Sequence, residues 1–221
     1  MRIGFVSGVL LLSACAGGQM PPEWQSQSHA ALERFRQHYL EGNSRLAQRS
    51  FSEAKAAVAS TGRPELVARV ELFRCALGMA ALDVDACMGF ESVKSDATAE
   101  DRVYGEFVSG HLREQDAHRL PSQYRGVATA RDEAARNRAL QQLEDPVSRL
   151  VAAGALFRLA QLSPEGLNNA IDTSSAQGYR RALLAYLNVQ AKRAESSGDT
   201  DALESIRKRI DLVYQSMPEP R

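Results

Sequence analysis

Residues 147–162 form the least polar stretch of the chain, and they set the main constraint on its fold. Two arginines and one glutamine interrupt this stretch without creating a polar face. It is too short to cross a bilayer, so we interpret it as a helix that is apolar nearly all round and therefore buried among other helices. Asp145 and Pro146 mark its predicted start, and Ser163 and Pro164 mark its end and the start of the next helix.

The rest of the chain has the spacing and the turn residues of helices. β-Branched residues never cluster with the alternation that a strand requires. We therefore predict an all-α fold, either an irregular array of helical hairpins or a helical bundle. The expected helices include one that ends at Gly42 and others over residues 44–60, 64–82, 103–112, 147–162, 179–187 and 203–217.

Composition excludes one broad class of function. The 27 basic residues balance the 27 acidic ones, so the formal net charge is zero. Binding to nucleic acid usually requires a basic surface, and this balance gives no support for one. Hydrophobic residues make up 44% of the chain, which is ordinary for a folded globular protein.

The N-terminus predicts the compartment. Met1 and Arg2 precede an apolar run, residues 3–14, whose length suits the hydrophobic part of a signal peptide and not a membrane-spanning helix. The run ends in Leu-Ser-Ala-Cys at residues 12–15, which resembles the lipobox of bacterial lipoproteins. An ordinary signal peptide, or a buried helix with a cysteine by chance, is the alternative interpretation.

The lipobox resemblance implies that Cys15 carries a diacylglyceryl group and that cleavage before it removes residues 1–14. Its new amine would commonly carry a further chain such as palmitate, and two or three chains give stable anchoring. Ala16 follows in place of the aspartate that retains Gram-negative lipoproteins at the inner membrane. This favours the periplasmic face of the outer membrane.

The resulting domain plan has a single folded unit. Residues 15–23 contain two glycines and two prolines and are predicted to be a flexible tether. Residues 24–217 would form one all-helical periplasmic domain, and residues 218–221 a frayed tail. Trp24 is the only tryptophan, and we expect it to dock the first helix.

Cys75 and Cys87 remain once Cys15 is assigned to lipid. An even pair in an oxidising compartment favours a disulfide, provided that the chain reverses near residues 82–84 and brings the two cysteines together. Two buried free thiols or a redox pair are the alternatives. Their spacing is not CxxC, so nothing supports a thioredoxin-like site or a zinc knuckle.

Two turns resemble known helical repeats. Gly42 to Ala47, followed by Phe51 and Ala54, is similar to the second half of a tetratricopeptide repeat. Gly198 to Ala202 has a similar turn, one residue short. This resemblance implies degenerate helical hairpins with a concave face for protein segments; an irregular bundle is the alternative. Residues 177–187 are also similar to segments of proteobacterial lipoproteins that have no known activity.

The sequence contains no catalytic motif that we recognise. His111, Glu114 and His118 would share a helix face, but the two histidines would lie roughly 10 Å apart along the axis, too far for one zinc ion. We interpret them as a solvated polar face. We expect no metal, cofactor or catalytic residue, and no enzyme.

The predicted function is that of a lipid-anchored adaptor or scaffold for an envelope protein partner. This hypothesis requires an exposed groove that is apolar or lined by arginines. The alternative is an envelope enzyme acting on cell-wall polymer, which requires a deep cleft where carboxylates or histidines converge. The sequence does not identify the partner or the binding face.

Overall fold

The computed structural model describes residues 21–217, and every regular element in that range is helical. Three short 3-10 helices, η1 (Val84–Cys87), η2 (Lys94–Asp96) and η3 (Glu114–Arg119), join the α-helices. The all-α prediction is thus confirmed. The α-helices are α1 (Glu23–Leu40), α2 (Ser44–Ala59), α3 (Pro64–Ala80), α4 (Met88–Glu91), α5 (Ala99–Val108), α6 (Ser122–Ala128), α7 (Glu133–Gln141), α8 (Pro146–Arg158), α9 (Pro164–Gln177), α10 (Arg180–Ser197) and α11 (Thr200–Gln215).

Side-chain caps fix where several helices begin. The side chain of Asp145 accepts a hydrogen bond from Ser148 N at 2.7 Å, and the hydroxyl of Ser163 accepts one from Gly166 N at 2.9 Å. Asp199 caps α11 in the same way. Such caps satisfy backbone N–H groups that have no partner within the helix. The starts predicted for α8 and α9 are therefore confirmed.

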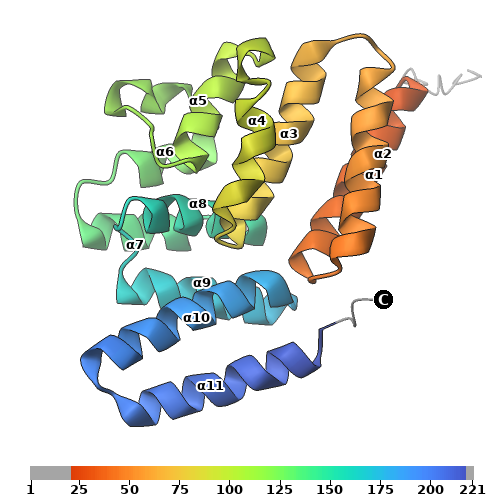
Figure 1. Ribbon diagram of the computed structural model, residues 1–221. Coiled ribbons are helices and arrows are strands. Elements are labelled where there is room, and N and C mark those ends of the chain that lie inside the picture. Colours follow the sequence, from red (N-terminus) through yellow and green to blue (C-terminus); the bar gives the residue numbers. More distant parts are fainter. Residues whose placement is uncertain (1–20, 218–221) are drawn as a thin grey trace, which may run out of the picture.

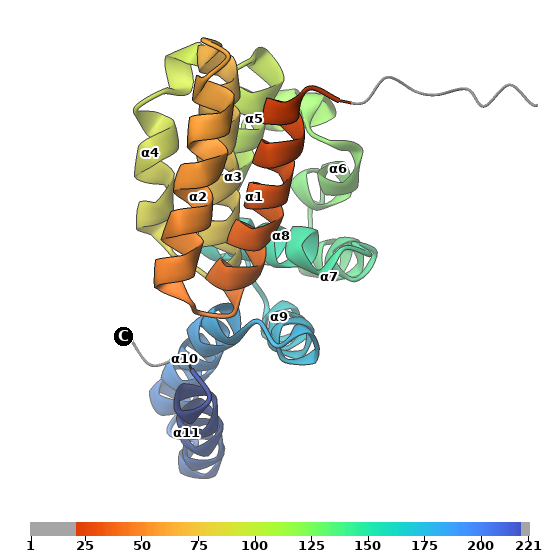
Figure 2. The same cartoon turned by 90° about the vertical axis from the view of Figure 1, so that its right-hand side faces the viewer.

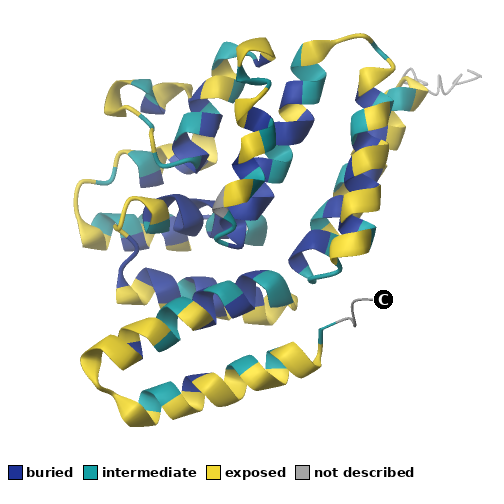
Figure 3. Cartoon of the chain, in the orientation of Figure 1, coloured by how far each residue is buried: buried dark blue, intermediate teal, exposed yellow. Residues whose placement is uncertain are grey.

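Neighbouring helices in the chain pack as adjacent pairs. The α1–α2 pair stands beside α3, and α8, α9, α10 and α11 follow one another in a stack below it (Figures 1 and 2). In this stack α9 packs between α8 and α10, whereas α11 packs chiefly on α10. Its outer side is therefore exposed along much of its length (Figure 3).

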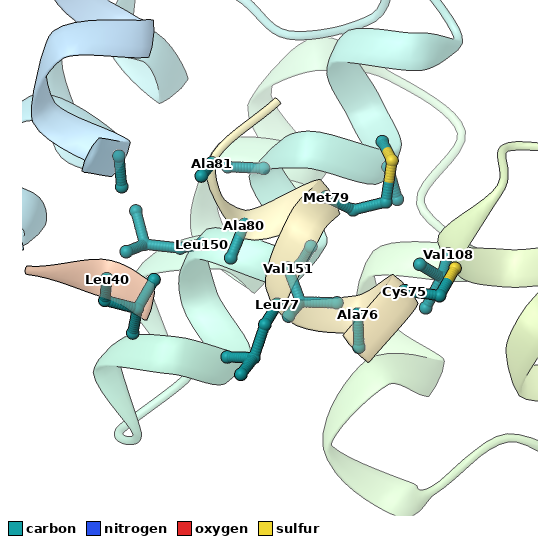
Figure 4. Packing of buried hydrophobic residues seen from close by; sticks show 14 of the residues in the cluster. Leu40, Cys75, Ala76, Leu77, Met79, Ala80, Ala81, Val108, Leu150 and Val151 are labelled. Carbon is teal, nitrogen blue, oxygen red and sulfur yellow. The ribbon is translucent and has the colours of Figure 1, made fainter. Parts of the chain in front are cut away.

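The core lies where α3 crosses α8. Leu150 and Val151 of α8 lie among Leu77 and Ala80 of α3 (Figure 4). The seven consecutive residues 150–156 are all buried, which confirms the expected central helix. The helix expected over residues 64–82 is α3, and it is also buried on most sides because α1, α2, α5, α8 and η1 all pack against it.

The apolar run that predicted α8 extends beyond the helix. We expected a helix to Leu162, but α8 ends at Arg158 because Ala160 adopts a left-handed backbone with φ of 54°. The N–H of Gln161 then donates to Leu156 O at 2.8 Å and closes the helix end. The reversal buries Leu162 after the helix has ended.

The pair Cys75–Cys87 forms a disulfide between α3 and η1. The chain reverses at Leu82, whose φ is 57°, as the proposed pairing required. Both cysteines are buried, and their Cα atoms lie 4.2 Å apart. The bond indicates an oxidising, extracytoplasmic compartment.

The first and last hairpins meet through two arginines of α10. Arg180 donates to Glu41 O at 3.0 Å, and Arg181 donates to Tyr39 O at 2.7 Å and to the Ser44 hydroxyl at 2.6 Å. These bonds hold the start of α10 against the turn between α1 and α2. The two hairpins show the paired packing that was expected, while membership of the tetratricopeptide family stays a prediction.

Candidate functional site

The residues predicted from the sequence divide into three groups. Cys15 and the lipobox lie outside the described residues, so lipidation stays a prediction. Cys75 and Cys87 lie inside the core as a disulfide. Trp24 lies at the start of α1 and packs, half-buried, against the core, as expected for a residue that docks the first helix.

The three residues of the rejected zinc hypothesis do not share a helix face. The expected helix over 103–112 ends at Val108, so His111 lies in a loop, and Glu114 and His118 lie on the 3-10 helix η3. His118 Nδ1 lies 2.8 Å from Gln115 O in its own turn. Within residues 21–217, no group of three or more His, Cys, Asp or Glu side chains is arranged to hold a metal ion.

Two acidic side chains, Asp83 before η1 and Asp101 in the first turn of α5, have structural partners. Asp83 accepts a hydrogen bond from the Tyr39 hydroxyl at 2.9 Å, and Asp101 pairs with Arg69 at 3.0 Å. Burial and the neighbouring Asp83 carboxylate raise the pKa of Tyr39, so its hydroxyl remains a donor at neutral pH. These contacts join α1 to η1 and α3 to α5.

A cavity of about 500 Å³ lies beside the C-terminal end of α8. We call it the α8 groove. Its apolar side chains include Phe107, Val127, Leu156 and Leu159, and they come from α5, α6, α8 and the residue that follows α8. Leu159 is 46% exposed, so an apolar side chain is accessible at the edge of this cavity.

Two backbone features place Leu159 at the edge of the α8 groove. The left-handed Ala160 ends α8 directly after it. Gly110, with φ of 72°, passes so close to the end of α8 that a Cβ there would lie 3.0 Å from the Cβ of Arg158. A left-handed backbone costs free energy for any residue that has a side chain. Ala160 adopts this backbone next to the groove.

Aromatic packing supports the floor of the α8 groove. Phe107 contacts Tyr124, with ring centroids 5.1 Å apart, and Tyr104 lies 5.4 Å from Tyr124. Burial raises the pKa of both tyrosines, so this cluster is neutral at physiological pH. The floor is thus apolar and fixed by its own packing.

The rim of the α8 groove carries positive charge. Arg131 and Arg136 line it, together with the single acid Glu114. Arg131 and Glu114 lie 3.9 Å apart on strongly exposed side chains, so they interact weakly. Arg136 Nε is shielded from solvent and has no hydrogen-bond partner among the described residues.

A second cavity of about 300 Å³ shares Leu112 with the α8 groove. We call it the arginine pocket, because Arg102, Arg113 and Arg119 line it. Arg102 comes from α5, and the other two come from η3 and the residue before it. An apolar groove and a cationic pocket therefore meet at one residue of the α5–η3 loop.

Sequence reasoning missed this site. Residues 122–141 form α6 and α7, whose weak periodicity gave no predicted helix. Leu159 was assigned to the interior of α8, since no glycine marks the end of that helix. No pattern in the sequence located the groove.

Comparison of the chain with family models, with curated proteins and with solved structures gave no significant match. No helix within residues 21–217 combines the length and the apolar character needed to cross a membrane. The α8 groove offers shape and apolar surface for a ligand, with cations beside it, an arrangement suited to binding.

Proposed function

We propose that the chain is an outer-membrane lipoprotein, anchored through lipid on Cys15, whose helical domain binds a partner protein in the periplasm. Two features support this cellular location. The first is the lipobox-like segment at residues 12–15. The second is the Cys75–Cys87 disulfide, which is typical of proteins outside the cytosol.

The observation that carries the binding role is the α8 groove. Leu159 presents an exposed apolar side chain beside the floor formed by Phe107, Val127 and Leu156. Exposed apolar surface with an arginine rim is typical of protein interaction sites, where apolar and arginine side chains supply most of the affinity. The tether at residues 15–23 would let this groove act at a distance from the membrane.

Site-specific photocrosslinking in living cells tests the proposal. A photoreactive amino acid replaces Leu159 in one variant and Lys208, exposed on the outer face of α11, in another. The first variant should crosslink to one discrete envelope protein, and the second should not. The yield from position 159 should fall when Cys15→Ser removes the anchor.

Two results would contradict the proposal. Equal crosslinking from positions 159 and 208 would show that the α8 groove has no partner of its own. A yield from position 159 that does not change with Cys15→Ser would remove the role of the anchor. For both variants, the mass of the crosslinked product is measured in addition to its yield.

A further inference from the structure

The arginine pocket holds more positive charge than its own acids neutralise. Two acidic side chains, Glu106 and Asp116, line it, and each already has a cation. Lys94 Nζ lies 2.6 Å from Glu106 Oε1, and Arg113 Nη2 lies 2.8 Å from Asp116 Oδ2. Neither carboxylate is therefore available to pair with Arg102 or Arg119.

Arg102 and Arg119 form no ion pair within residues 21–217. Arg102 donates one hydrogen bond to Ala97 O, and a guanidinium has five donors in all. Two guanidinium groups without carboxylates therefore line the same cavity. A carboxylate matches such a group because it accepts two parallel hydrogen bonds from it.

The position of the pocket indicates where a carboxylate would come from. Leu112 lines both the arginine pocket and the α8 groove, so a chain segment bound in the groove would pass the pocket within a few residues. Arg136, with its unpartnered Nε, adds a cation on the groove side. A bound segment would therefore contact the apolar side chains of the α8 groove and arginines on both sides of Leu112.

We infer that the partner binds through a segment that combines apolar and acidic residues. Its apolar side chains fill the α8 groove beside Leu159, and an Asp or Glu carboxylate enters the arginine pocket between Arg102 and Arg119. This inference rests on the proposed function, because it names the chemistry of the partner at that same site. A segment without acids would leave the two guanidinium groups unpaired.

Peptide selection tests the inference. The full chain carrying Cys15→Ser is used to select binders from a random twelve-residue phage-display library. Selected peptides should contain apolar residues and an excess of Asp and Glu over the starting library. The Arg102→Gln/Arg119→Gln variant should lose the acidic excess, and Arg207→Gln/Arg209→Gln, which removes two exposed arginines of α11, should keep it.

A synthetic copy of the strongest selected peptide gives the size of the effect. Replacing its acids by the matching amides should weaken binding to the unmodified pocket by about two- to fivefold, because the amide lacks the carboxylate charge that pairs with the exposed arginines. The same replacement should change little in binding to the Arg102→Gln/Arg119→Gln variant. Thermal unfolding verifies that all variants are folded.

The possible failures are distinguishable. Peptides that are lost with Leu159→Asp but show no acidic excess would overturn this inference and leave the proposed function in place. Failure to select peptides, or selection unaffected by Leu159→Asp, would overturn both. Binding to phosphatidylglycerol vesicles that disappears in the Arg102→Gln/Arg119→Gln variant would show that the pocket takes lipid phosphate, and the inference would fall.

Discussion

At the scale of single residues, the crossing of α3 and α8 depends on Gly154. A Cβ at this position would lie 2.0 Å from the backbone oxygen of Met79, which cannot move without shifting α3. Gly126 of α6 is the matched control, because a Cβ there meets only Ala139 Cβ at 3.7 Å.

We therefore expect Gly154→Ala to lower the free energy of unfolding by about 1–3 kcal/mol or more, the usual cost of overpacking a core. Gly126→Ala should be neutral or should stabilise α6 by up to about 1 kcal/mol, because alanine favours helices over glycine. Urea unfolding followed by circular dichroism measures both. Equal stability of the two variants would show that the α3–α8 crossing is looser than described.

Buried tyrosines make the fold sensitive to high pH. Burial raises the pKa of Tyr39, Tyr104, Tyr124 and Tyr186 above the ordinary 10.0, so folding favours the neutral phenol. The stabilisation is complete below pH 10 and is lost as the pH rises further, because the unfolded chain ionises first.

The free energy of unfolding should thus fall above pH 10, by up to about 1.4 kcal/mol per pH unit for a tyrosine that stays neutral in the folded protein. Tyr186→Phe should make this slope shallower, and the exposed Tyr214→Phe is the control. Rapid unfolding measurements between pH 9 and 11 give the slope before the disulfide reacts. A slope identical in the protein and in Tyr186→Phe would contradict the assignment.

At the scale of elements, the disulfide attaches η1 to the central helix α3. Its two cysteines are separated by 12 positions in sequence, and closing a loop of this size contributes about 3 kcal/mol on the chain-entropy model. The segment that it fixes includes Asp83, which also bonds to Tyr39 of α1.

In a Cys15→Ser background, Cys75→Ser/Cys87→Ser should lower the free energy of unfolding by about 3 kcal/mol. Reductant should lower the stability of the parent to the same value and should not affect the double variant. Urea unfolding with and without reductant measures this. A parent that is insensitive to reductant, with both thiols open to alkylation, would show that the disulfide does not form.

Local signals predicted the starts of α2, α3, α8 and α9 and missed some element ends. Asp145 and Ser163 cap their helices as the sequence indicated, whereas Asp199 starts α11 before the expected residue 203. The end of α8 depends on the left-handed backbone of Ala160, and an alanine in the sequence does not predict this conformation. The other features of the fold depend on tertiary packing. The burial of α3 is an example, because it depends on neighbouring helices whose positions periodicity does not predict.

At the scale of the whole molecule, the candidate site forms only where several elements pack together in the folded chain. The α8 groove and the arginine pocket draw on residues from 99 to 161, on α5, η3, α6, α7 and α8 with their connecting turns. No spacing in the sequence predicts that the α8 groove and the arginine pocket would meet at Leu112. The fold class was predictable from periodicity, whereas the site required the packing of five elements.

The central proposal is that lipid on Cys15 would hold this helical domain to a membrane outside the cytosol, where its groove would bind a partner. The most direct measurement is the mass of the N-terminal peptide of the protein isolated from the membrane fraction. We predict a peptide that begins at Cys15 and carries a diacylglyceryl group and an amide-linked acyl chain. A peptide that begins at Met1, with an unmodified thiol at Cys15, would contradict the account.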